Sequence, residues 1–191
     1  MRLTAFSGLL LIGIAACQPR GLNLTEVNAP TLNCDARADA QWVPDTGRTY
    51  NIQAAASGPT CAQDVVTLAV RAPDGSLILA WAGRAGDLFG LSDAPDATAM
   101  KAALAAWIDQ GSNNLTTAST LPPWPEGGEG PASENSEFPF HPESWLDRAS
   151  WEQMRSENAP LFAFPQGRES LAVFLLREGQ LEPIGVQQFP G

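Results

Sequence analysis

The sequence predicts a single α+β domain, built from an antiparallel sheet of about five or six strands with two helices on one face. The expected order of elements is β-β-β-α-loop-α-β-β-β. Short apolar runs bounded by turn residues occupy both ends of the domain, and segments with helical periodicity lie between them. A long segment rich in proline and glycine separates the two helical segments. The two halves are therefore expected to mirror each other.

The first strands are predicted from alternation and from one turn. Residues 48–53 alternate between polar and apolar side chains, which is typical of a strand. Residues 65–71 are mostly β-branched or large apolar residues, and residues 77–81 form a second apolar run. The intervening sequence Ala72-Pro73-Asp74-Gly75 is typical of a turn. Residues 65–81 are therefore expected to form a β-hairpin.

The first helix is predicted between Asp96 and Gly111. Asp96 is a suitable N-cap, and Gly111 ends the helical pattern. Apolar residues at helical spacing form a stripe that consists of Met100, Leu104, Trp107 and Ile108. This stripe is expected to lie on the sheet while Lys101 and Asp109 remain in solvent.

The second helix is predicted over residues 144–158. Ser144 and Ser150 each begin a capping-box sequence, so the first residue of the helix is left open, and Pro160 ends it. Trp145 and Trp151 are six residues apart and point in different directions on an ideal helix. One of them is therefore expected to be exposed.

The last strands are predicted from three apolar runs. Residues 161–164 form the first, and residues 171–176 contain six consecutive apolar residues, which favours a central position in the sheet. After a turn at residues 177–180, residues 181–189 form the final strand. Pro183 lies in this strand and favours an edge position.

Residues 119–142 contain many proline and glycine residues and show no regular period. Their aromatic residues predict an ordered crossover that lies along the domain, docked by Trp124 and Phe140. The alternative is an exposed loop that binds a partner. The candidate partner-binding residues are Trp124, Phe140, His141 and Trp151.

Residues 1–16 have the layout of a secretory signal peptide. Arg2 is followed by an apolar run too short to span a bilayer, and Ala15-Ala16 ends it. The sequence Ile14-Ala15-Ala16-Cys17 resembles the lipobox of bacterial lipoproteins, and this resemblance implies cleavage before Cys17 and acylation of that residue with fatty acids such as palmitate. Cleavage by an ordinary signal peptidase after Ala15 or Ala16 is the alternative. Residues 17–40 are expected to form a lipidated tether, and residues 41–191 the domain.

The chain has three cysteines, and an odd number in an exported protein requires an explanation. Acylation of Cys17 accounts for one thiol and leaves Cys34 and Cys61 to form a disulfide in an oxidising compartment. A redox or metal role is the alternative, but the sequence has no Cys-x-x-Cys motif and His141 is its only histidine. A structural disulfide is therefore expected.

The whole chain resembles small exported lipoproteins of uncharacterised function in alphaproteobacteria. This resemblance rests on the lipobox, the Cys34 and Cys61 pair, the sequence Leu-Pro-Pro-Trp-Pro-Glu at residues 121–126, and residues 185–191. Only the lipobox is a specific motif. In lipoproteins of Gram-negative bacteria, an aspartate after the acylated cysteine is the usual signal for retention in the inner membrane. Gln18 therefore implies attachment to the outer membrane, facing the periplasm.

The composition excludes several classes of function. The net charge is −10, and it becomes −11 when Arg2 is removed with the signal peptide, so binding to nucleic acid is not expected. The sequence lacks a nucleophile elbow, a zinc-ligand set, a calcium loop and a phosphate-binding loop. We therefore expect no cofactor, no metal and no catalytic residue.

The expected function is a non-enzymatic binding or structural module of the cell envelope, with an envelope protein or peptidoglycan as its partner. One alternative is a cell-wall-directed enzyme with paired carboxylates. It would be favoured by acidic residues, one with a raised pKa, in a cleft lined by Trp124 or Trp151. The other alternative is a carrier of a small apolar ligand, which requires an open cavity between sheet and helices.

Overall fold

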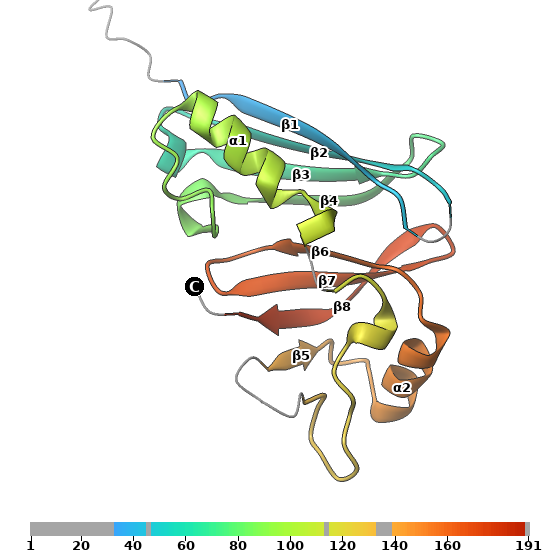
Figure 1. The fold of residues 1–191 in the computed structure, drawn as a ribbon. Coiled ribbons are helices and arrows are strands. Elements are labelled where there is room, and N and C mark those ends of the chain that lie inside the picture. The colour runs from blue at the N-terminus through green and yellow to red at the C-terminus, as the bar shows by residue number, and fades with distance from the viewer. Residues whose placement is uncertain (1–32, 45–46, 113–114, 133–138, 190–191) are drawn as a thin grey trace, which may run out of the picture. The chain divides into compact units, whose positions relative to one another are not determined.

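The computed structural model describes residues 33–44, 47–112, 115–132 and 139–189. The predicted signal peptide, the lipobox with Cys17 and most of the predicted tether lie outside these residues. Within them the α+β class is confirmed, with two helices (Figure 1). The expectation of one sheet with five or six strands is wrong, because eight strands form two four-stranded antiparallel sheets.

The first sheet contains four strands that pair in chain order: β1 (Ala36–Trp42), β2 (Tyr50–Ser57), β3 (Val65–Arg71) and β4 (Leu77–Arg84). The predicted hairpin is confirmed as β3 and β4. At its turn, Gly75 has a φ of 86°, which glycine adopts without a steric penalty. The Asp74 carboxylate accepts a hydrogen bond from the Ser76 N–H and closes the turn.

Strand β1 corrects the predicted boundary between tether and domain. Residues 36–40 belong to this strand, although they were expected to lie in the tether. The side chains of Ala36, Ala38 and Trp42 are buried, whereas Arg37 and Asp39 between them are exposed. The period of two therefore places one face of β1 in the core.

The second sheet has the strand order β5 (Phe140–Pro142), β8 (Gln180–Gln188), β7 (Ser170–Arg177) and β6 (Leu161–Pro165). The predicted interior position of β7 is confirmed. The predicted edge position of the last strand is wrong, because β8 lies between β5 and β7. Pro183 is nevertheless accommodated, because it lies beyond the end of short β5 and at an irregularity in the pairing of β8 with β7.

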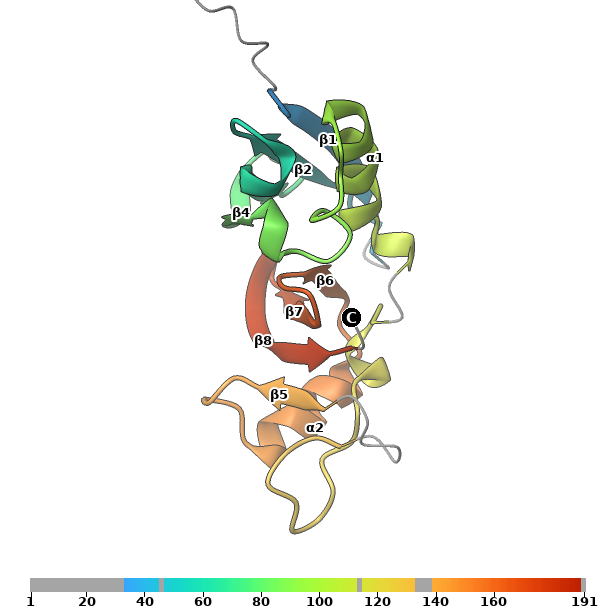
Figure 2. The same ribbon diagram turned by 90° about the vertical axis from the view of Figure 1, so that its left-hand side faces the viewer.

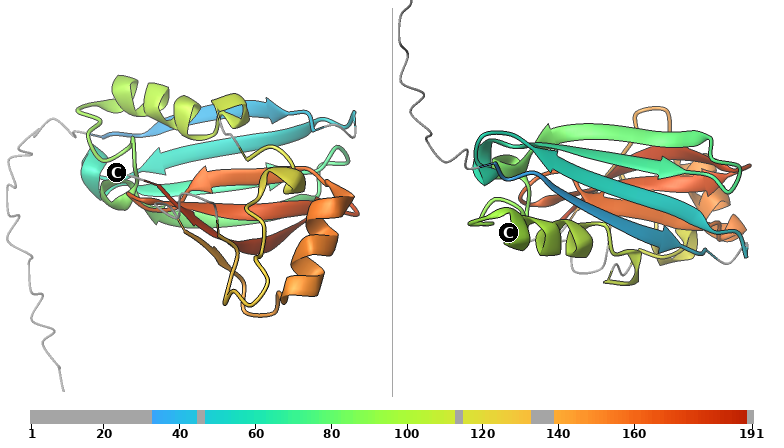
Figure 3. Two further views of the ribbon diagram at one scale, coloured as in Figure 1. Left: turned by 60° about the horizontal axis from the view of Figure 1, so that its bottom comes forward. Right: turned by 90° about the horizontal axis from the view of Figure 1, so that it is seen from above.

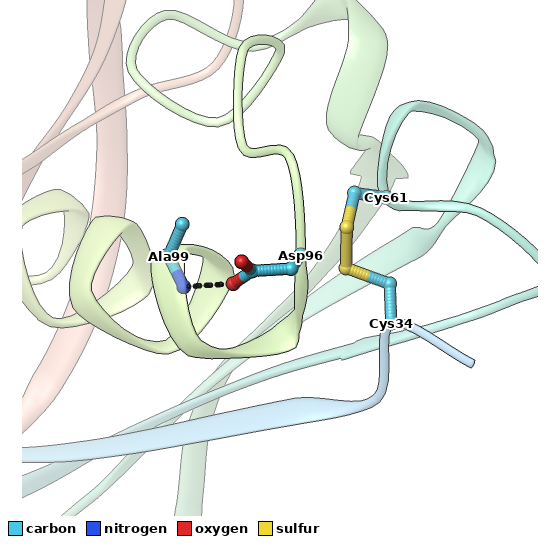
Figure 4. Close-up of a disulfide and its surroundings, with 4 residues drawn as sticks. All are labelled: Cys34, Cys61, Asp96 and Ala99. Atoms are coloured by element: carbon cyan, nitrogen blue, oxygen red, sulfur yellow. Dashed lines mark hydrogen bonds between the residues drawn. A yellow bond between two sulfur atoms is a disulfide. The ribbon is translucent and has the colours of Figure 1, made fainter. Parts of the chain in front are cut away.

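Both helices begin at an aspartate N-cap. Helix α1 (Ala97–Trp107) follows Asp96, whose carboxylate accepts the Ala99 N–H at 2.8 Å, as the sequence predicts (Figure 4). Helix α2 (Arg148–Glu157) follows Asp147, whose carboxylate accepts the Ser150 N–H at 2.8 Å. Neither predicted capping-box serine is therefore the N-cap of α2, which is shorter than the predicted helix.

The two helices do not share one face of one sheet, which corrects the predicted layering. Helix α1 runs along β1 and buries Met100, Leu104 and Trp107 in the core of the first sheet (Figure 1). Helix α2 packs on the second sheet, on the side away from the first sheet (Figure 2). The two sheets lie face to face (Figure 3). The second sheet is therefore covered on both faces.

Strand β6 shows the consequence of this layering most clearly. Phe162 and Phe164 point into the core shared with the first sheet, whereas Leu161 and Ala163 point into the core shared with α2. All four are at most 1% exposed. A consecutive apolar run is therefore required here, because both faces of the strand are dry.

Aromatic side chains fill the space between the two sheets. The ring centroids of Trp42 and Phe162 are 5.4 Å apart, and those of Trp81 and Phe164 are also 5.4 Å apart. Trp107 reaches the same cluster from α1, and its indole N–H donates to the Pro165 carbonyl at 2.7 Å. This bond ties the end of α1 to the end of β6.

The predicted disulfide between Cys34 and Cys61 is present (Figure 4). It joins Cys34, two residues before β1, to the short 3-10 turn that follows β2, Cys61–Gln63. Both cysteines are buried. The start of edge strand β1 is therefore held to the first sheet by a covalent bond.

Candidate binding pocket

Two of the four candidate partner-binding residues lie in the core. Trp151 is fully buried in α2, and Phe140 in β5 is 3% exposed. Their ring centroids are 5.0 Å apart, and Trp124 lies 6.3 Å from Trp151 in an edge-on arrangement. The expectation that Phe140 and Trp151 contact a partner is therefore corrected, because burial leaves them no surface to offer. Trp124 is half-buried and His141 is exposed, so their role in binding stays a prediction.

The crossover is docked on α2, as the sequence predicts for its described residues. The Trp124 N–H donates to the Glu152 carboxylate at 2.8 Å, and the Trp151 indole N–H donates to the Pro122 carbonyl at 2.9 Å. The Arg155 guanidinium donates to the Leu121 carbonyl at 3.0 Å. These bonds satisfy polar groups that packing would otherwise leave without partners. Residues 133–138 of the crossover lie outside the described residues.

The carboxylate bonded to Trp124 does not show the raised pKa expected of the acid in a cell-wall enzyme. The hydrogen bond from the Trp124 N–H, together with Arg155, lowers the pKa of the Glu152 carboxyl. The Glu152 carboxyl therefore favours its ionised form near neutral pH, whereas a general acid must hold a proton.

The acid with a raised pKa lies elsewhere. Asp64 is fully buried just before β3, and neither of its carboxyl oxygens has a hydrogen-bond partner in the described residues. Burial, with a smaller contribution from the negative charge of Asp35, raises the pKa of the Asp64 carboxyl. No tryptophan-lined cleft contains this carboxyl among the described pockets. We therefore treat Asp64 as a structural group of the first sheet.

An apolar pocket of about 290 Å³ opens beside the second half of α1. Helix α1 contributes Ala103, Ala106 and Trp107 to its wall. The ends of β6 and β7 contribute Pro165 and Leu171, and two phenylalanines complete it. We call this site the apolar pocket. It is lined by Phe89, Gly90, Ala103, Ala106, Trp107, Asp109, Pro165, Leu171 and Phe189. The pocket therefore lies between a helix and the second sheet.

Two phenylalanines distant in sequence meet at the apolar pocket. Phe89 is 49% exposed, and its ring contacts that of Phe189 edge-on, with centroids 5.3 Å apart. The Phe89 N–H donates to the Gly167 carbonyl at 3.2 Å, and the Phe189 N–H donates to the Glu169 carbonyl at 3.1 Å. The turn between β6 and β7 thus positions both aromatic residues.

The same turn is also tied to the first sheet. The Arg168 guanidinium donates to the Gly86 carbonyl at 2.9 Å, in the segment that follows β4. Arg168 lies between Gly167 and Glu169, so three consecutive residues hold the loop with Phe89 and the end of β8 with Phe189. The aromatic part of the apolar pocket is therefore built before any ligand arrives.

The small side chains of α1 explain why the pocket is open. Ala103 and Ala106 present only methyl groups where a larger residue would fill the space against Leu171 and Pro165. Asp109 is the only titratable residue that lines the pocket, and its carboxylate accepts the Gly111 N–H at 3.0 Å. The pocket therefore offers an apolar surface with one acidic group.

The sequence alone does not predict this pocket. Phe89 lies in a loop before α1, and Phe189 lies at the end of the last strand, so no local pattern connects them. The one sequence feature that could have indicated the pocket is Phe89, an aromatic residue that lies next to Gly90 and outside any periodic apolar run. Gly90 has a φ of 78°, so the loop turns sharply directly after Phe89.

The described residues contain no group of three or more His, Cys, Asp or Glu side chains that could hold a metal ion. None of the described helices combines the length and the hydrophobicity needed to cross a bilayer. The chain matches no protein-family model, no curated protein and no solved structure.

Proposed function

We propose that this chain is an outer-membrane-anchored periplasmic lipoprotein whose domain is a non-enzymatic binding module of the cell envelope. The anchoring rests on the sequence that ends in Cys17. The disulfide between Cys34 and Cys61 supports export, because such bonds persist in oxidising compartments. The apolar pocket is the observation that carries the proposed binding role.

The proposed ligand is a small molecule with an apolar body and no negative charge. The volume of about 290 Å³ lies just below the usual range for ligand pockets, roughly 300–1,000 Å³, which favours a compact ligand. The net charge of −10 disfavours anions. The edges of Phe89 and Phe189 favour an apolar or aromatic group. This ligand class corresponds to the carrier alternative that the sequence left open.

Filling the pocket tests the proposed binding site. The probe is N-phenyl-1-naphthylamine, an uncharged apolar dye whose fluorescence rises when it leaves water. The Ala106→Phe variant places a ring where a methyl group now lines the pocket, and we expect its affinity for the dye to fall at least about tenfold. Ala105→Phe is the matched control, because Ala105 is exposed on the same helix and does not line the pocket. Equal loss of affinity in both variants, or none in either, would contradict the assignment.

A separate variant tests the proposed anchor. Replacement of Cys17 by alanine removes the sulfur that would carry the acyl chains, so the variant should fractionate with soluble periplasmic proteins. If the Cys17→Ala protein still sediments with membranes, the lipoprotein proposal is wrong. Dye binding by the purified variant should be unchanged, so the two parts of the proposal can fail independently.

A further inference from the structure

A second hollow lies on α2, separate from the apolar pocket, and Trp145 is its most unusual component. This hollow has a volume of about 290 Å³ and is lined by Trp145, Leu146, Ser150, Gln153, Met154, Glu157 and Arg177. We call it the Trp145 hollow. Trp145 is 56% exposed, whereas Leu146 and Met154 beside it are buried. One of Trp145 and Trp151 is therefore exposed, as expected, but Trp145 precedes α2 and does not share a helix with Trp151. An indole ring left in solvent beside a hollow offers an apolar face without rearrangement.

Polar side chains that are already hydrogen-bonded to one another form the rest of the Trp145 hollow. One oxygen of the Glu157 carboxylate accepts the Gln153 amide at 3.0 Å, and the other accepts the Arg177 guanidinium at 2.8 Å. The Arg177 guanidinium also lies 3.6 Å from the Glu182 carboxylate. These bonds link α2 to β7 and β8, so the array is held in place before a ligand binds.

The array retains capacity to bind further polar groups. The Arg177, Glu157 and Glu182 side chains are 39%, 39% and 42% exposed, so solvent reaches all three. A guanidinium carries five N–H donors and a carboxylate about four acceptor sites, more than the bonds within the array use. The hollow therefore presents donors and acceptors together, next to an aromatic face.

The charge of the array restricts the ligand. One guanidinium shared by two carboxylates leaves a net charge of −1 among Arg177, Glu157 and Glu182. The hydrogen bond from Gln153, followed by that from Arg177, lowers the pKa of the Glu157 carboxyl, so this residue remains ionised. Phosphate, sulfate and carboxylate groups are therefore disfavoured in the hollow.

We propose that the Trp145 hollow binds one ring of an uncharged saccharide. A pyranose ring has an apolar face of C–H groups, which can stack on the Trp145 indole. Its hydroxyl groups both donate and accept hydrogen bonds, which matches the mixture of groups on Gln153, Glu157 and Arg177. This proposal does not rest on the apolar pocket, because the two sites share no residue.

The test is a titration of the full chain with chitotetraose, a soluble uncharged oligosaccharide of N-acetylglucosamine, followed by saturation-transfer NMR. We expect binding at millimolar concentration or below, with magnetisation transferred chiefly to the protons of the ring face. Trp145→Ala should lower the affinity at least about tenfold. Trp145→Phe should retain part of the affinity, since it keeps an aromatic face. Phe89→Ala is the matched control, because it removes an exposed aromatic side chain from the other pocket, and it should bind as the wild type does.

Three results would overturn the proposal: no saccharide binding by the wild type at millimolar concentration, equal affinity in Trp145→Ala and the wild type, or preferential binding of an oligolysine peptide. The last result would instead indicate cation–π contact with Trp145. The Trp145→Ala protein is expected to keep the unfolding midpoint of the wild type, because Trp145 is exposed. Competition by solubilised peptidoglycan or by lipopolysaccharide then distinguishes the two envelope sources of sugar rings.

Discussion

Removal of the disulfide gives the sharpest quantitative prediction for the fold. The change is the double variant Cys34→Ala/Cys61→Ala, in which both buried sulfurs are replaced and no unpaired thiol remains at either site. Without the bond, the start of β1 is still held by its pairing with β2, by its contacts with α1 and by the hydrogen bond from the Ser57 hydroxyl to the Asp35 carboxylate. The folded structure is expected to persist, because the two cysteines are a small part of the first core and the second core contains neither of them.

The expected magnitude follows from the length of the closed loop. The bonded cysteines are 27 residues apart in the sequence, and the chain-entropy model assigns a loop of this length roughly 3.5 kcal/mol of stabilisation. For a domain of this size, each 1 kcal/mol shifts the midpoint of thermal unfolding by roughly 2–4 °C. The double variant should therefore unfold about 7–14 °C below the wild type. Loss of two buried sulfur atoms acts in the same direction.

The assay is equilibrium unfolding in urea, monitored by tryptophan fluorescence, for the wild type, the double variant and the wild type in reductant. The reduced wild type should approach the stability of the double variant, since both lack the cross-link. Hydrogen exchange should become faster in β1 before it does so in β7, because β1 is an edge strand and β7 is interior. A loss of less than about 1 kcal/mol, with unchanged exchange in β1, would refute this reasoning.

Three further substitutions test other parts of the structure. Burial raises the pKa of the Asp64 carboxyl, so the folded wild type should lose stability as pH rises from about 4 to 7. Asp64→Asn removes this titration, so the urea midpoint of the variant should rise relative to that of the wild type over the same pH range. The same difference between the two midpoints at both pH values would exclude this. Asp96→Ala should cost about 1 kcal/mol in urea unfolding, because the N-cap bond to Ala99 is lost. Trp151→Ala should cost about 3–5 kcal/mol, since it empties a fully buried site and removes the bond to Pro122.

The local elements were largely predictable from the sequence because their signals are local. Asp96 acts through an N–H three residues away, and the turn at Asp74 and Gly75 is set by its own residues. Strand β1 also carried a local signal, the alternation of Ala36 and Ala38 with charged residues. That signal was weak because alanine and aspartate are poor strand formers.

The arrangement of the sheets was not predictable in the same way. The apolar run of β6 shows that both faces of the strand are buried, but a central strand covered by helices and a strand between two layers give the same pattern. Pro183 favoured an edge position because nothing in the sequence indicates β5, a strand of three residues that pairs with only part of β8. Tertiary packing decides both points.

The candidate site depended even more on the fold. Phe140 of the crossover and Trp151 of α2 proved to be core, because both pack in the hydrophobic cluster that covers the outer face of the second sheet. The apolar pocket instead combines a loop phenylalanine, the end of the last strand and two alanines of α1. Hydrogen bonds of three residues in the β6–β7 turn help to bring Phe89 and Phe189 together, although the two residues are distant in the sequence.

The most direct test of the proposed function is to locate the bound dye by methyl NMR. N-phenyl-1-naphthylamine is titrated into protein labelled at alanine and leucine methyl groups. Binding in the apolar pocket should give the largest shifts at Ala103, Ala106 and Leu171, which line it, and small shifts at Leu68 in the core of the first sheet. The largest shifts at Leu146 or at other methyl groups away from the pocket, or no saturable shifts, would contradict the claim that this pocket is the binding site.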